Sequence, residues 1–171
     1  MKFLGEIFRT PGIATSGRTI HRDAVRAVIR RGEELLMIYS PINGDYKFPG
    51  GGVEPGESYH QALAREIREE CGLNSAQVGA PFGFVIEYDR PAETDYDLFK
   101  MTSRYYFCQV GGGMGVQRLD PYESDLGFAP VWVSIGAAID NNQAILRSVG
   151  RKIPRWTKRD TFVLEYLIEE G

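Results

Sequence analysis

Residues 51–73 constrain the fold of this chain more than any other part of its sequence. A glycine-rich turn leads to Ser58, and Gln61 follows three residues later, which is the spacing of a helix capping box. Gly72 stands where a residue in the left-handed conformation commonly ends a helix. The sequence therefore predicts a helix that begins after Ser58 and ends before Gly72.

The side chains of this helix divide into an apolar stripe and an acidic face. Apolar residues recur every four positions and predict the face that packs on the core: Leu63, Ile67 and Cys71. Glu66, Glu69 and Glu70 are spaced i, i+3 and i+4, so their carboxylates lie together on another face. Because these like charges repel, we expect Glu70→Gln to leave the metal-free protein at least as stable as before.

Two interpretations of the acidic face are open. Three glutamates alone are ordinarily a solvated helix surface. A hard divalent cation with oxygen ligands would also explain them. Glycines 50–52 precede the helix and let the main chain come close to a ligand, which favours the cation.

The pattern Gly51-x5-Glu57-x7-Arg65-Glu66-Ile67-x-Glu69-Glu70-x-Gly72-Leu73 resembles the Nudix box at every position. The resemblance implies an α/β (α+β) fold, an α/β/α sandwich with a mixed β-sheet between helices. It also implies a hydrolase that uses Mg²⁺ or Mn²⁺ to cleave a phosphoanhydride bond. The implied substrate is a nucleoside diphosphate linked to another group, with water attacking one phosphorus.

The resemblance also assigns roles to individual residues. The implied metal ligands are Glu66, Glu69, Glu70 and the carbonyl of Gly50, with Glu57 as a further ligand or as a group that holds one in place. Glu69 and Glu70 are also implied to take part in catalysis, and Arg65 to orient a glutamate.

A further acidic residue is expected outside this segment, from the loop before the apolar run 130–133. The candidates are Asp120, Glu123 and Asp125. We select Glu123, because it stands in mid-loop and its side chain reaches further than that of an aspartate. Its expected role is general base for the attacking water or an added metal ligand. A solvated loop carboxylate is the alternative, and Glu87 is the reserve candidate.

The remaining sequence predicts a single layered domain over residues 1–171, with residues 1–20 as an N-terminal extension. Apolar runs predict strands over 23–30, 34–39, 83–89, 99–110, 116–119 and 130–133, and a short extended piece over 46–49. Helices are predicted from Ser134 to about residue 141 and after Thr157, which has capping-box spacing to Asp160. Strands interleaved with helices indicate an α/β or α+β arrangement.

A basic cluster surrounds Trp156 near the end of the chain. It comprises Arg151, Lys152, Arg155, Lys158 and Arg159. We interpret it as a solvated entry to the last helix, as such charge runs usually are. The alternative is a site for a phosphate and a stacked base.

Composition limits the partners. The net charge is −3, with 20 basic and 23 acidic residues, which argues against nucleic acid or an anionic membrane as the main partner. The two cysteines, Cys71 and Cys108, are expected to be reduced core thiols. Without an apolar run of transmembrane length or a good signal peptide, we expect a cytoplasmic protein. A homodimer is left open.

Two other functions compete with hydrolysis of a small nucleotide-like substrate. A nucleotide-binding sensor without turnover would be expected to lose some of the glutamates, which are all present here. An isomerase acting on terpenoid diphosphates would need further cysteine and histidine chemistry. The sequence leaves damaged nucleoside triphosphates, ADP-ribose, nucleotide sugars and capped RNA open as substrates.

Overall fold

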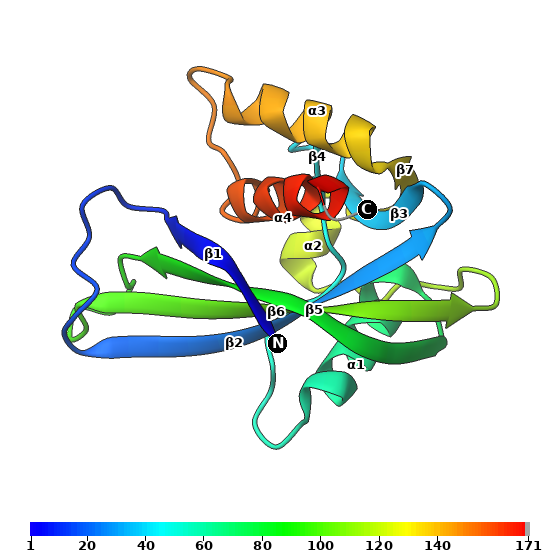
Figure 1. Cartoon of the computed structure of the whole chain (residues 1–171), viewed down its shortest axis with the longest axis horizontal. Coiled ribbons are helices and arrows are strands. Elements are labelled where there is room, and N and C mark those ends of the chain that lie inside the picture. The colour runs from blue at the N-terminus through cyan, green and yellow to red at the C-terminus, as the bar shows by residue number, and fades with distance from the viewer. Residues whose placement is uncertain (170–171) are drawn as a thin grey trace.

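The computed structural model describes residues 1–169, which form seven strands and four helices (Figure 1). The strands are β1 (Lys2–Phe8), β2 (Thr19–Arg31), β3 (Glu34–Ser40), β4 (Asp45–Lys47), β5 (Ser75–Asp89), β6 (Leu98–Gly111) and β7 (Ala129–Ser134). The helices are α1 (Tyr59–Cys71), α2 (Pro121–Asp125), α3 (Ile135–Leu146) and α4 (Thr157–Glu169). No helix within residues 1–169 has both the length and the apolar content needed to cross a membrane.

The strands form one mixed sheet in the order β1-β5-β6-β2-β3-β4, and β7 pairs with β3. β1 runs parallel to β5, and β2 runs parallel to β6. The other pairs are antiparallel. The predicted return of the chain from β2 into β3 is confirmed, with Arg30 opposite Leu35.

Helices cover both faces of the sheet, with α1 on one side and α3 and α4 on the other (Figure 1). Side chains alternate between the two faces along β2. Val25, Ala27 and Ile29 pack with the apolar stripe of α1, whereas Val28 packs in the cluster that includes residues of α3 and α4. The predicted sandwich of a mixed sheet between helices is confirmed. The same alternation turns Arg26 toward the α4 side.

Helix α1 begins and ends where the sequence predicts. The Ser58 hydroxyl accepts a hydrogen bond from the Gln61 amide, and the Gln61 side chain accepts one from the Ser58 amide. Gly72 has a φ of 67° and donates its N–H to the Arg68 carbonyl. The predicted apolar stripe is fully buried. Cys71 and Cys108 are free, buried thiols, as expected.

Two predictions about secondary structure are wrong. Residues 116–119 are not a strand, because the chain there runs along the end of α1, where the Arg118 amide bonds to the Glu69 carbonyl. Thr157 and Asp160 do not form a capping box. The Thr157 hydroxyl donates to Asp45, and Asp160 accepts hydrogen bonds from neighbouring groups: the Phe48 amide, Tyr105 and Arg159.

The N-terminal extension contains the strand β1, for which no secondary structure was predicted. Leu4 and Ile7 are buried in the same core as α3 and α4, whereas Phe3 and Phe8 are exposed. β1 pairs with β5 over Lys2–Phe8, so this strand is part of the sheet.

Candidate active site

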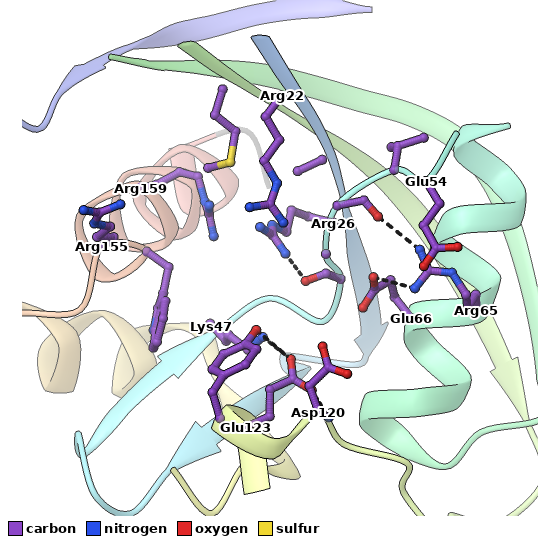
Figure 2. Close-up of a pocket in the computed structure, with 18 of the residues that line it drawn as sticks. Arg22, Arg26, Lys47, Glu54, Arg65, Glu66, Asp120, Glu123, Arg155 and Arg159 are labelled. Atoms are coloured by element: carbon purple, nitrogen blue, oxygen red, sulfur yellow. Dashed lines mark hydrogen bonds and ion pairs between the residues drawn. The ribbon is translucent and has the colours of Figure 1, made fainter. Parts of the chain in front are cut away.

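A cavity of about 480 Å³ lies between α1, the loop before it, β2, the α2 segment and the start of α4 (Figure 2). One part of its wall is acidic and is formed by Glu54, Glu66, Asp120 and Glu123. The other part is basic and is formed by Arg9, Arg22, Arg26, Lys47, Arg155 and Arg159, with Trp156 beside them. The cavity, which Arg65 also lines, therefore combines four carboxylates with a larger number of cationic side chains.

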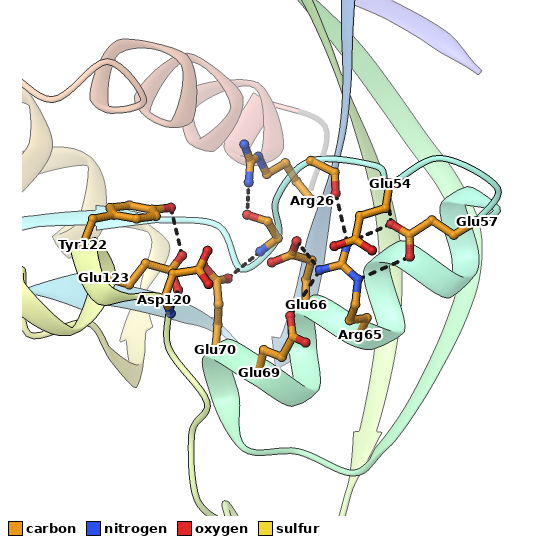
Figure 3. Close-up of polar contacts among 12 residues, drawn as sticks. Arg26, Glu54, Glu57, Arg65, Glu66, Glu69, Glu70, Asp120, Tyr122 and Glu123 are labelled. Carbon is orange, nitrogen blue, oxygen red and sulfur yellow. Dashed lines mark hydrogen bonds and ion pairs between the residues drawn. The ribbon is translucent and has the colours of Figure 1, made fainter.

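Arg65 holds three acidic residues of the 51–73 segment together (Figure 3). Its Nη2 donates to Glu57 at 2.7 Å and to the Gly52 carbonyl at 3.0 Å. Its Nη1 donates to Glu66 at 2.8 Å and to Glu69 at 3.1 Å. The hydrogen bond with Arg65 lowers the pKa of Glu57, and the same bond raises the pKa of Arg65. Arg65 thereby fixes the positions of three carboxylates.

Glu66 lines the cavity directly. Burial, followed by the charge of Glu70, raises the pKa of Glu66 to about 7 despite the contact with Arg65. A Cβ at position 51 would collide with the Glu66 carboxylate, so only glycine allows this close approach. The site therefore brings a carboxylate of α1 against the main chain of the glycine loop.

Glu70 is 1% exposed and has a cationic partner. One carboxylate oxygen accepts from Lys47 Nζ, and the other accepts from the Gly50 amide at 2.6 Å. The expectation that Glu70→Gln would only relieve repulsion is therefore wrong, because the substitution would leave Lys47 without its main partner. The Gly50 carbonyl accepts a hydrogen bond from Arg26 Nη1.

Glu123 lies in α2, a short helix within the segment predicted as a loop. It is 7% exposed and accepts hydrogen bonds from Tyr122 Oη at 3.0 Å and the Asp120 amide at 3.1 Å. Lys47 Nζ lies 3.9 Å from its carboxylate. Burial, followed by the charge of Glu70, raises the pKa of Glu123. Glu123 is therefore not a solvated carboxylate.

Of the other acidic candidates, only Asp120 lines the cavity among the described residues. Asp120 lines the cavity, whereas Asp125 is exposed and does not line it. Glu87 is 1% exposed and accepts hydrogen bonds from Arg9 and Arg159, so both of its oxygens are engaged behind the cavity wall.

The interpretation of the basic cluster as a solvated entry to α4 is wrong for Arg159. Its side chain is 1% exposed and pairs with Asp160 at 2.8 Å and Glu87 at 3.2 Å. Trp156 also lines the cavity and donates its indole N–H to Asp45 at 2.7 Å. Arg155 lines the cavity with a side chain that is 71% exposed. The rest of the cluster is exposed as expected: Arg151, Lys152 and Lys158.

Arg26 and Lys47 were not predicted as site residues, although the sequence carries a signal for each. Arg26 interrupts an apolar run in β2, and Lys47 stands between two aromatic residues. Both are buried, at 8% and 5% exposure. A charged residue is seldom buried without a partner, so a charge inside an apolar strand indicates an internal site.

The site offers carboxylate oxygens, which are the kind of ligand that a hard divalent cation prefers. Within residues 1–169, no group of three or more His, Cys, Asp or Glu side chains converges closely enough to hold a metal ion. Arg65 and Lys47 separate the glutamates in this arrangement. Glu66 and Glu70 nevertheless face each other beside the glycine loop (Figure 3). Mg²⁺ usually binds one or two carboxylates of a protein, so Glu66 and Glu70 are suited to hold it.

Comparisons with known proteins identify relatives of this chain. The RNA pyrophosphohydrolase of a Nitratiruptor species is 28% identical over 103 residues, which are 57% of this chain and 66% of that protein. The CTP pyrophosphohydrolase of Escherichia coli (strain K12) is 42% identical over 57 residues, which are 31% of this chain and 42% of that protein. These matches thus span less than two thirds of either relative.

Solved structures share the fold. A NUDIX hydrolase from Nitrosomonas europaea superposes with a TM-score of 0.58 and 24% identity, covering 88% of this chain and 90% of that one. The MutT protein from Methanosarcina mazei Go1 gives a TM-score of 0.55 and 22% identity over 90% of this chain and 98% of that one. A family model described as NUDIX domain matches residues 20–156. The chain belongs to the NUDIX family.

Proposed function

We propose that this chain is a divalent-metal-dependent pyrophosphohydrolase that cleaves a phosphoanhydride bond in a nucleoside diphosphate linked to another group. The observation that carries the proposal is the meeting of carboxylates, Glu66 of α1 among them, with a basic wall in one cavity. Acidic oxygens can hold a cation, and guanidinium groups can hold phosphates. The names of the two pyrophosphohydrolase relatives support the same reaction.

The residues that would hold Mg²⁺ or Mn²⁺ are Glu66 and Glu70, with Glu69 and the Gly50 carbonyl beside them. Glu57 acts through Arg65, to which it is bound. When bound, the cation polarises phosphate oxygens and lowers the pKa of a coordinated water.

Glu123 serves as the general base in this proposal. It accepts a proton from the water whose oxygen attacks one phosphorus, and the bond from that phosphorus to the bridging oxygen breaks. Arg26 and Lys47 offset the negative charge of the phosphates at this stage. Arg65 keeps Glu66 and Glu69 in place throughout, because it bonds to both.

A panel of compounds with Mg²⁺ tests the proposal. It should contain a nucleoside triphosphate, ADP-ribose, a nucleotide sugar and a capped RNA, with products identified by mass spectrometry. We expect at least one compound to be cleaved between two phosphates, with one oxygen from ¹⁸O-labelled water in a product.

Binding of these compounds without any cleavage would contradict the proposal. That result would favour the sensor that binds a nucleotide without turnover.

A further inference from the structure

Two buried guanidinium groups in the cavity wall lack a full set of partners. Arg159 Nη2 and Arg26 Nε are buried and find no hydrogen-bond partner among residues 1–169. Both residues line the cavity, at 1% and 8% exposure. Buried polar atoms in native proteins are nearly always satisfied by protein or water, so an unpaired donor in a cavity wall is open to a partner in the cavity.

Arg22 adds a third guanidinium to this group. It stands four residues before Arg26 on β2 and so lies on the same face of the sheet. Its side chain lies against Gly52, where a Cβ would be 2.9 Å from Arg22 Nη2. Figure 2 shows the guanidinium groups of Arg22, Arg26 and Arg159 turned toward one space. We call these three residues the arginine subsite.

The arginine subsite has an excess of positive charge. Arg159 pairs with Asp160 and shares Glu87 with Arg9. Within the described part of the chain, Arg22 and Arg26 form no ion pair at all. Guanidinium donors match the oxygens of a phosphate in geometry and charge.

The subsite adjoins the proposed reaction centre and extends away from it. Arg26 donates to the Gly50 carbonyl, next to Glu70, whereas Arg159 belongs to α4 on the far wall (Figure 2). A phosphate chain that starts at the α1 carboxylates would therefore continue toward Arg159.

Resting on the proposed function, we propose that the arginine subsite holds a phosphate of the substrate that is not joined by the cleaved bond. The substrate class is then one with three linked phosphates, such as a nucleoside triphosphate. Compounds with two phosphates and a neutral group beyond them, such as ADP-ribose and nucleotide sugars, would leave the arginines without an anion.

Substitutions on β2 test the subsite. We expect Arg22→Gln and Arg26→Gln to lower kcat/KM for a nucleoside triphosphate about tenfold or more, mainly through KM, since each removes charge-assisted hydrogen bonds. For ADP-ribose, the kcat/KM of Arg22→Gln should change less than about twofold, because no bond to the subsite is lost. Arg26→Gln lowers it for both substrates, because Arg26 also bonds to the Gly50 carbonyl at the reaction centre. Arg30→Gln is the matched control, since Arg30 is exposed on the same strand and donates to the Gly32 carbonyl. Equal losses for both substrates with Arg22→Gln, or none, would overturn the subsite.

Binding of inorganic tripolyphosphate to the metal-free protein, measured by calorimetry, separates the subsite from the catalytic proposal. We expect wild type and Arg30→Gln to bind it, and Arg22→Gln to bind it about tenfold more weakly. If no compound in the panel is hydrolysed but this difference is found, the proposed function fails and the subsite stands. If Arg22→Gln binds like wild type, the subsite is wrong. Arg22 is exposed, so this arm holds even if Arg26→Gln does not fold.

Discussion

The glutamates of α1 share a face but differ in how tightly the protein holds them. The Glu70 side chain is 1% exposed and bonds to Lys47, whereas that of Glu69 is 35% exposed and bonds only to Arg65 among the described residues. Their spacing in the sequence predicts the shared face. It does not predict Lys47, because that residue comes from β4, and the pairing depends on the fold.

Glu70→Gln tests the buried pair. We expect turnover to fall at least about a hundredfold, because the substitution removes a charged group at the proposed reaction centre. Without metal, the free energy of unfolding should fall by about 2 kcal/mol, because Lys47 loses a charged partner in a buried place. Glu69→Gln, at a more exposed position, is the control for stability. An unchanged melting temperature for Glu70→Gln would contradict the pairing.

Glu123→Gln tests the proposed base. We expect turnover at saturating substrate and metal to fall by about tenfold or more, as for the smaller acid–base contributions. Asp125→Asn should leave turnover within about twofold, since Asp125 is exposed outside the cavity and takes no part in proton transfer. Mild and equal effects of the two substitutions would return the role of base to the glutamates of α1.

Among the elements, α1 could be predicted best, because its cap, its apolar stripe and its terminal glycine agree with one another. Apolar runs predicted strands β3, β6 and β7 to within one residue at each end, whereas β2 begins four residues before the predicted strand. β1 was missed, since only Leu4 and Ile7 are buried and its pairing with β5 is distant in sequence. α2 was missed because a helix of five residues has too little pattern to recognise.

Asp45→Asn tests how α4 is attached to β4. Asp45 is 1% exposed and accepts from Trp156 and Thr157, and burial raises its pKa. Because the pKa of Asp45 is higher in the folded state, this carboxyl stabilises the fold most at a pH below its unfolded pKa of about 4. That contribution is lost as the pH rises through the folded pKa.

Asparagine at position 45 carries no charge, so the stability of the Asp45→Asn variant does not decline with rising pH for this reason. Chemical denaturation should therefore show the variant gaining on wild type as pH rises from about 4 to neutrality. A difference that shrinks over the same range would contradict the buried charge at Asp45.

The whole molecule forms the site from segments that are distant in the sequence. α1 covers one face of the sheet and α4 the other, and the cavity lies where β2 and the glycine loop pass between them (Figures 1 and 2). The family match covers residues 20–156, so Arg9 and Arg159 lie outside it. The pattern of residues 51–73 predicts the acidic part of the site, which lies within the family match. The basic wall could not be predicted, because it depends on the assembled fold.

The dependence of hydrolysis on a divalent cation tests the central claim most directly. Wild-type protein, stripped with a chelator, is assayed on the cleaved compound while Mg²⁺ or Mn²⁺ is titrated back. We predict no hydrolysis in excess chelator and full recovery with either ion, because the α1 glutamates are the proposed ligands. Full activity in excess chelator would contradict the account.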